Sequence, residues 1–82
     1  MSRYRIQYAD PAEAARKAMA PEARAAFERA MPKTLGVDPY GHGSSEVKRG
    51  DRDYREVTLA GAFVVYYVSA SVLTVTAVRI VH

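Results

Sequence analysis

The residues best suited to bind phosphate lie in one charged stretch, EVKRGDRDYREV, from Glu46 to Val57. Its four cations are Lys48, Arg49, Arg52 and Arg55. Arginine binds phosphate oxygens with a planar fork of donors and stays charged, and lysine acts as a point charge. The stretch also suits a solvated hairpin whose charges pair across two strands, for example Arg55 with Glu46. The residues alone leave both interpretations open.

Length and composition predict one globular domain. The chain has 82 residues, of which 49% are apolar and 26% charged, too apolar for a disordered chain. Its longest apolar run, Ala60 to Val68, is far shorter than the roughly 20 residues that span a bilayer. The N-terminus lacks the apolar core of a signal peptide. We therefore expect a cytoplasmic protein with no membrane partner.

The charge balance permits a polyanionic partner, because the net charge is +3 and the estimated pI about 9.5. The chain has no cysteine, and its only histidines are His42 and His82. These residues are too few to argue for a metal site, so we expect no metal and no other cofactor.

Two helices are predicted in the first half of the chain. Asp10 is the expected N-cap of the first, with Glu13 completing a capping box, and this helix should run to about Met19. A second helix should begin at Pro21 and kink or end near Met31, because proline is disfavoured inside a helix. If it continues past Pro32, Leu35 is expected to be its last apolar contact. The side chains expected to face a sheet are Ala23, Phe27, Ala30 and Met31.

Alternating and apolar segments predict strands before and after this helical hairpin. Their expected ranges are Tyr4–Tyr8, Ser45–Arg49, Tyr54–Leu59, Ala62–Val68 and Val72–Ile80. The run from Phe63 to Val68 is apolar on both faces, which indicates a central strand. The predicted fold class is α+β: a two-helix hairpin on a twisted, mostly antiparallel sheet of four to five strands, with the first strand at an edge.

Several short motifs accompany this order of elements: Asp38-Pro39, Val47-Lys48-Arg49-Gly50, Tyr54-Arg55, Gly61-x-Phe63-x-Val65-x-Tyr67 and Ala77-Val78-Arg79. With the element order, they resemble the RelE/ParE superfamily of bacterial toxins, which belong to type II toxin–antitoxin pairs. The resemblance covers essentially the whole chain. It implies a RelE-like toxin: a metal-independent endoribonuclease that cleaves messenger RNA on the ribosome and is silenced by a cognate antitoxin.

Three positions depart from the family pattern. Val64 stands where the central strand usually has an arginine. Val81 occupies the position of a histidine in some ribonuclease members, and His82 follows it. Ser45 stands at the general-base position of one subgroup, and Glu46 follows it.

Cleavage of RNA through its 2′-hydroxyl needs a base, an acid and cations that stabilise the charged phosphorane. Under the resemblance, the expected catalytic residues are Arg55, His82 and Glu46. The expected RNA- or phosphate-binding residues are Lys48, Arg49, Arg52, Arg79, Tyr54 and Tyr67.

Strand alternation constrains these assignments. Lys48 and Arg49 should point to opposite faces, and Arg55 should share a face with Val57 and Leu59 unless a bulge intervenes. Two other functions fit the same fold: a ParE-like inhibitor of DNA gyrase, and a non-catalytic protein-binding member.

Overall fold

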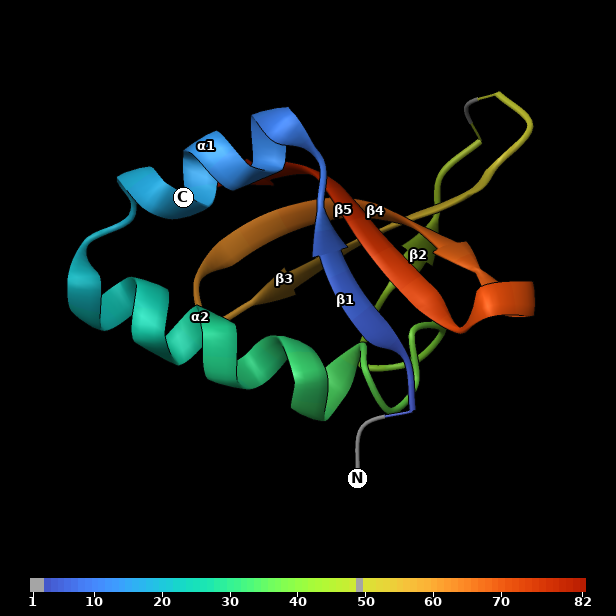
Figure 1. The fold of residues 1–82 in the computed structure, drawn as a ribbon, viewed down its shortest axis with the longest axis horizontal. Coiled ribbons are helices and arrows are strands. Elements are labelled where there is room, and N and C mark those ends of the chain that lie inside the picture. Colours follow the sequence, from blue (N-terminus) through green and yellow to red (C-terminus); the bar gives the residue numbers. More distant parts are fainter. Residues whose placement is uncertain (1–2, 49) are drawn as a thin grey trace.

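A computed structural model describes residues 3–48 and 50–82 of the chain (Figure 1). The elements are β1 (Arg5–Tyr8), α1 (Asp10–Ala18), α2 (Pro21–Thr34), β2 (Ser45–Glu46), β3 (Asp53–Leu59), β4 (Ala62–Ser69), a 3₁₀ turn (Ala70–Val72) and β5 (Thr74–Val81). The predicted order of one strand, two helices and four strands is confirmed. Among the described residues, no helix is long and apolar enough to cross a membrane.

The strands form one mixed sheet in the order β1-β5-β4-β3-β2. β1 pairs in parallel with β5, and the other neighbours are antiparallel. β1 thus lies at an edge and β4 at the centre, as predicted. β2 is shorter than predicted, because it ends at Glu46. Residues 47–48 and 50–52 then project away from the main body of the sheet (Figure 1).

Both helices begin with a proline in their first turn, where its missing N–H leaves no bond unmade. The predicted N-cap of α1 is off by one residue. The N–H of Glu13 donates to the carbonyl of Ala9, so Ala9 is the cap, and no side chain caps this end. Asp10 lies inside the first turn, where its charge is favourable near the positive end of the helix dipole.

α2 does not end near Met31 as predicted but continues through Pro32 to Thr34. Pro32 removes one hydrogen bond only two residues from the helix end. The N–H of Leu35 still donates to Met31, and the Thr34 hydroxyl donates to Ala30. Leu35, fully buried, packs in the core. Burial of this last turn offsets the local cost of the proline.

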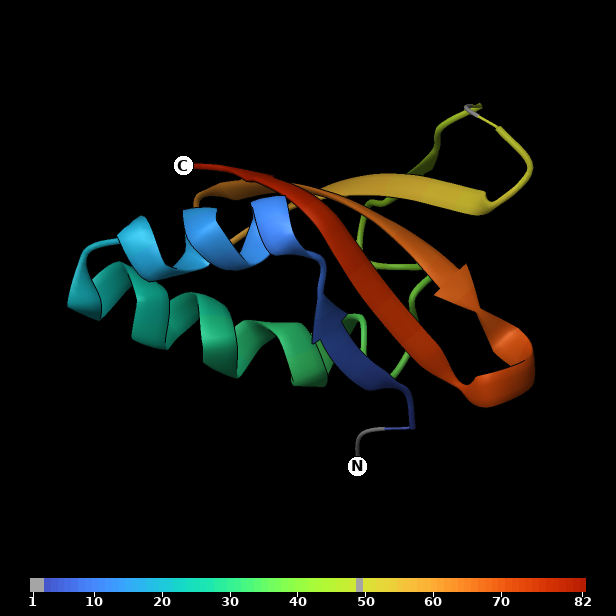
Figure 2. The ribbon, with the colours of Figure 1, turned by 45° about the horizontal axis from the view of Figure 1, so that its top comes forward.

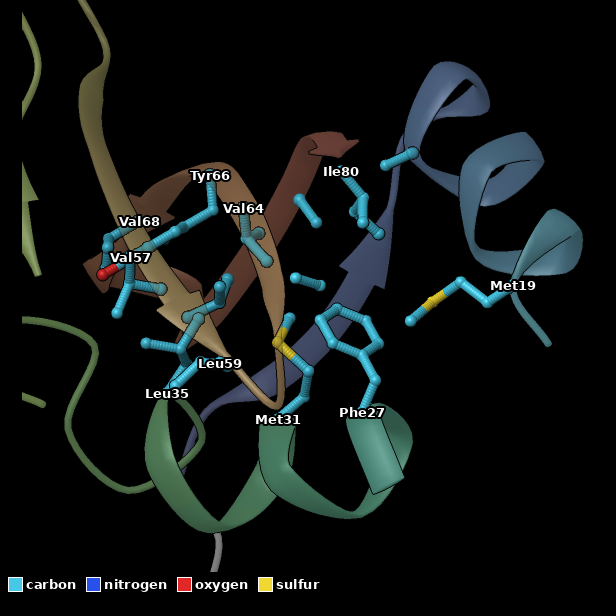
Figure 3. Close-up of a cluster of buried hydrophobic side chains, with 14 residues drawn as sticks. Met19, Phe27, Met31, Leu35, Val57, Leu59, Val64, Tyr66, Val68 and Ile80 are labelled. Atoms are coloured by element: carbon cyan, nitrogen blue, oxygen red, sulfur yellow. The ribbon is translucent and has the colours of Figure 1, made fainter. Parts of the chain in front are cut away.

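Both helices cover the same face of the sheet, and the core lies between the two layers (Figures 2 and 3). Phe27 and Met31, four residues apart on α2, are fully buried against this face. Tyr66 and Val64 of β4 are fully buried opposite them. Ala23 is exposed, contrary to the prediction, and Ala30 is only half-buried. In the described part of the chain, no helix covers the opposite face of the sheet.

Candidate nucleic-acid interface

The strand register decides which side chains reach the face without helices. Val57 of β3 pairs with Val64 of β4, and both are in the core. Tyr54 pairs with Tyr67 and Glu56 with Val65; these positions have the other parity and therefore lie on the opposite face. We call this surface the open face and define it by Tyr54, Glu56, Val65, Tyr67 and Arg79.

Arg79 belongs to the open face because of an irregularity in the pairing of β4 with β5. Tyr66 pairs with Ala77, but the next residue, Val65, pairs with Arg79, so Val78 is an extra residue in β5. A bulge of this kind reverses the alternation beyond it. Without it, Arg79 would point toward the helices. With it, Arg79 is exposed on the open face and Ile80 enters the core.

Two tyrosines and an arginine form an aromatic platform at one end of the open face. The rings of Tyr54 and Tyr67 are 5.6 Å apart in a T-shaped arrangement. The guanidinium carbon of Arg52 lies 4.5 Å from the centroid of the Tyr67 ring. Aromatic rings combined with arginine planes are what single-stranded nucleic acids stack upon. The platform can therefore bind a base and its adjacent phosphate.

Arg55 lies on the face that the helices cover, with the parity predicted from the sequence. It pairs in register with Tyr66, and the register of β3 with β4 is continuous through it. Its Nε donates to the Ser44 hydroxyl (3.1 Å), and Nη2 donates to the carbonyls of Ser44 (3.2 Å) and Tyr40 (3.4 Å). The side chain therefore anchors the segment between α2 and β2.

The same segment has two further anchors. The Tyr40 hydroxyl donates to a carboxylate oxygen of Asp53 (2.9 Å), and the buried Tyr66 hydroxyl donates to the carbonyl of Pro39. Desolvation, followed by the bond to Asp53, raises the pKa of Tyr40 to about 12. Burial likewise raises the pKa of Tyr66. Both hydroxyls thus stay protonated donors at neutral pH.

The other two expected catalytic residues are also away from the open face. Glu46 pairs in register with Arg55 and shares its parity. His82 follows Val81, which pairs with Phe63, and its Nε2 donates to the carbonyl of Ala15 on α1 (2.9 Å). Because the position after Val81 lies beside Ala62, four residues from Tyr66 on β4, His82 and Arg55 are about 13 Å apart along the strand direction, on strands that flank β4 on opposite sides. The structure does not bring these three residues into one site.

The remaining expected phosphate ligands divide by position. Arg52, Arg79, Tyr54 and Tyr67 gather on or beside the open face. Lys48 is exposed on the projecting segment beyond β2, and Arg49 lies outside the described residues. Val64 is fully buried against the helices, so its position cannot display a phosphate ligand in this chain.

Glu56 is a residue that sequence reasoning missed. It is half-buried on the open face, in one row with Val65 and Arg79. The alternation predicted for β3 already placed Glu56 on the other face of the strand from Arg55, so the sequence predicted which face it occupies. What the sequence did not show was that Arg79 shares this row, because that depends on the bulge at Val78.

A second concavity lies beside β1 and α2, with Tyr8, Arg16 and Glu28 in its wall. The Arg16 guanidinium forms ion pairs with Glu13 and Glu28 and stacks on the Tyr8 ring, 5.0 Å from its centroid. Of the two arginines that line this concavity, Arg5 and Arg16, the second is thus already neutralised by two carboxylates. The open face is the better candidate for binding a polyanion.

Two helices on one face of a mixed five-stranded sheet define an α+β fold that is also found in solved structures. A chain of the archaeal RelE–RelB complex from Pyrococcus horikoshii OT3 superposes with a TM-score of 0.76 and 16% identity, over 95% of this chain and 92% of that one. A chain of the intact RelBE toxin–antitoxin complex of E. coli gives 0.72 and 18%, over 94% and 93%. No protein-family model and no curated protein matches the sequence. The chain thus has the RelE fold implied by its motifs.

Proposed function

We propose that this protein is the toxin of a type II toxin–antitoxin pair and a metal-independent endoribonuclease that cleaves messenger RNA on the ribosome, in the cytoplasm. The observation that carries this proposal is the open face, where Tyr54, Tyr67, Arg52 and Arg79 gather on a RelE fold. Tyrosines there stack on exposed bases, and the arginines neutralise adjacent phosphates. Ribosome dependence and RNA cleavage are inferred from the resemblance to RelE.

The proposed partner is a cognate antitoxin. Both similar structures are of RelE in complex with RelB. A RelB-like protein that covers the exposed cations Arg52 and Arg79 would remove the charges that messenger RNA needs, and so silence the toxin.

One observation favours a second candidate function. The described strands place neither histidine on the open face: His82 contacts α1, and His42 lies in the segment before β2. A fold with a basic, aromatic face and no histidine on it also suits a protein-binding role, such as inhibition of DNA gyrase. The two functions are separable by their targets.

The test is cleavage of a defined messenger RNA by the purified protein, with and without programmed ribosomes, read by primer extension. We expect ribosome-dependent cuts, and we expect Arg79→Ala to lower kcat/KM by about 10²-fold, because it removes a cation that stabilises the transition state. Arg29→Ala, which removes an exposed arginine from α2, is the matched control and should keep the wild-type rate.

Loss of activity in Arg79→Ala alone would support the open face as the site. Intact messenger RNA together with trapped gyrase–DNA complexes would instead establish the gyrase function. Equal cleavage by the wild type and Arg79→Ala would place the site elsewhere.

A further inference from the structure

One carboxylate on the open face has no structural role among the described residues. Glu56 is flanked on its own strand by Tyr54 and Thr58, which share its face, and across the strands by Ser45 and Val65. Within residues 3–48 and 50–82, its side chain makes no hydrogen bond or ion pair. By contrast, Glu13 and Glu28 are both paired with Arg16.

The neighbours of Glu56 form a row across three strands. Glu56 of β3 pairs with Val65 of β4, and Val65 pairs with Arg79 of β5. Adjacent strands are about 4.8 Å apart, so the backbones of Glu56 and Arg79 are separated by about 10 Å. Val65, a short apolar side chain only 6% exposed, forms the floor between them. The row thus presents an anion and a cation on either side of an apolar floor.

Stacking on the aromatic platform would set the orientation of an RNA strand bound over this row. Tyr54 and Tyr67 are two residues along β3 and β4 from Glu56 and Val65, on the same face. Nucleotides whose bases stack on the two rings would bring a neighbouring phosphodiester next to the row. Arg79 would then meet the non-bridging oxygens, and Glu56 would lie on the other side of the phosphate.

We propose that the scissile phosphodiester of the RNA lies over Val65, between Glu56 and Arg79, and that Glu56 is the general base. This inference rests on the proposed ribonuclease function and assigns the base within it. The Glu56 carboxylate accepts the proton of the 2′-hydroxyl, and the 2′-oxygen forms a bond to phosphorus. The bond from phosphorus to the 5′-oxygen breaks, and that oxygen takes a proton from water. The products are a 2′,3′-cyclic phosphate and a 5′-hydroxyl, and the hydroxide left by water removes the proton from Glu56.

Geometry separates Glu56 from the carboxylate that the sequence favoured. Glu46 lies on the side of the sheet that the helices cover, opposite Arg55 in register. Glu56 shares its face with Arg79 and both platform tyrosines. A base and a phosphate ligand have to reach the same phosphodiester, and Glu56 is placed to do so together with Arg79.

The test compares single-turnover cleavage of ribosome-bound messenger RNA by the wild type, Glu56→Gln, Glu56→Asp and Glu46→Gln. We expect Glu56→Gln to lower the rate of the chemical step by about 10²-fold or more, with ribosome affinity unchanged. Glu56→Asp keeps a carboxylate and should recover part of the rate. Glu22→Gln, the same change at an exposed position at the start of α2, is the matched control and should cleave like the wild type. Urea denaturation of each variant checks that it is folded.

Each outcome decides the assignment. A slow chemical step in Glu56→Gln only, with Glu56→Asp intermediate, would support Glu56 as the base. A wild-type rate in Glu56→Gln, or a slow step in Glu46→Gln instead, would overturn this role and leave the ribonuclease function standing. Loss of ribosome affinity in Glu56→Gln would also overturn it, because a base acts in the chemical step. No cleavage by the wild type would overturn the proposed function and the role of Glu56 with it.

Discussion

The guanidinium of Arg55 is occupied by the backbone of the segment between α2 and β2. It donates to the Ser44 and Tyr40 carbonyls and to the Ser44 hydroxyl, and lies 5.4 Å from the centroid of the Tyr40 ring. An arginine that made these bonds could not turn to a phosphate on the other face of the sheet without breaking them. Arg55 therefore contributes to stability, and Arg79, exposed on the open face, is the arginine to which the proposed function assigns RNA binding.

We expect Arg55→Ala to lower the free energy of unfolding by about 1–2 kcal/mol, because partly buried acceptors lose a charged donor. Urea denaturation measures this as a lower midpoint at constant slope. Arg29→Ala, which removes an exposed arginine, should leave the midpoint unchanged. An unchanged midpoint for Arg55→Ala with loss of cleavage would instead restore Arg55 as the catalytic arginine expected from the sequence.

At the scale of elements, the segment between α2 and β2 is held to the sheet by three side chains, Arg55, Tyr40 and Tyr66. Two of these anchors are tyrosine hydroxyls that act as donors only while protonated. Because this segment leads directly into β2, its attachment also fixes the start of the projecting hairpin that carries Lys48.

The raised pKa of Tyr40, about 12, predicts a loss of stability in alkali. The proton is held more tightly in the folded protein than in the unfolded one, where the pKa is about 10. The contribution of Tyr40 is therefore complete below pH 10 and is lost as the pH rises from about 10 to 12.

Urea midpoints between pH 9 and pH 12, a range set by the raised pKa of Tyr40, test this in the wild type and Tyr40→Phe. We expect the difference between the two proteins to shrink across it. The effect should be modest, since the Tyr40 side chain is partly exposed. A difference that stays constant with pH would show that the Asp53 bond does not stabilise the fold.

The elements themselves were largely predictable, because each left a local signal. Prolines marked both helix starts, and a two-sided apolar run marked β4 as central. The bulge at Val78 left no such signal, since Ala77, Val78 and Arg79 read as uninterrupted strand. Only packing selects it: with the extra residue, Ile80 enters the core instead of Arg79.

At the scale of the molecule, the protein is a sheet with helices on one face and a basic, aromatic surface on the other. This separation explains which site residues could be predicted. The cations and tyrosines were identifiable by type and by their resemblance to RelE, and Arg52, Arg79, Tyr54 and Tyr67 do gather. Arg55, Glu46 and His82 do not join them. Strand alternation predicted the face of Arg55, whereas the register that pairs Glu46 with Arg55 and the contact of His82 with α1 depend on the tertiary fold.

The central claim is that the open face, and not the helix side, acts on messenger RNA. Photo-crosslinking tests it most directly: ribosomes are programmed with messenger RNA that carries 4-thiouridine in the A-site codon, the protein is added, and crosslinked peptides are identified by mass spectrometry. We predict crosslinks to Tyr54 or Tyr67 on the open face. Crosslinks confined to the segment around Tyr40 or to His82, with none on β3 or β4, would contradict the account.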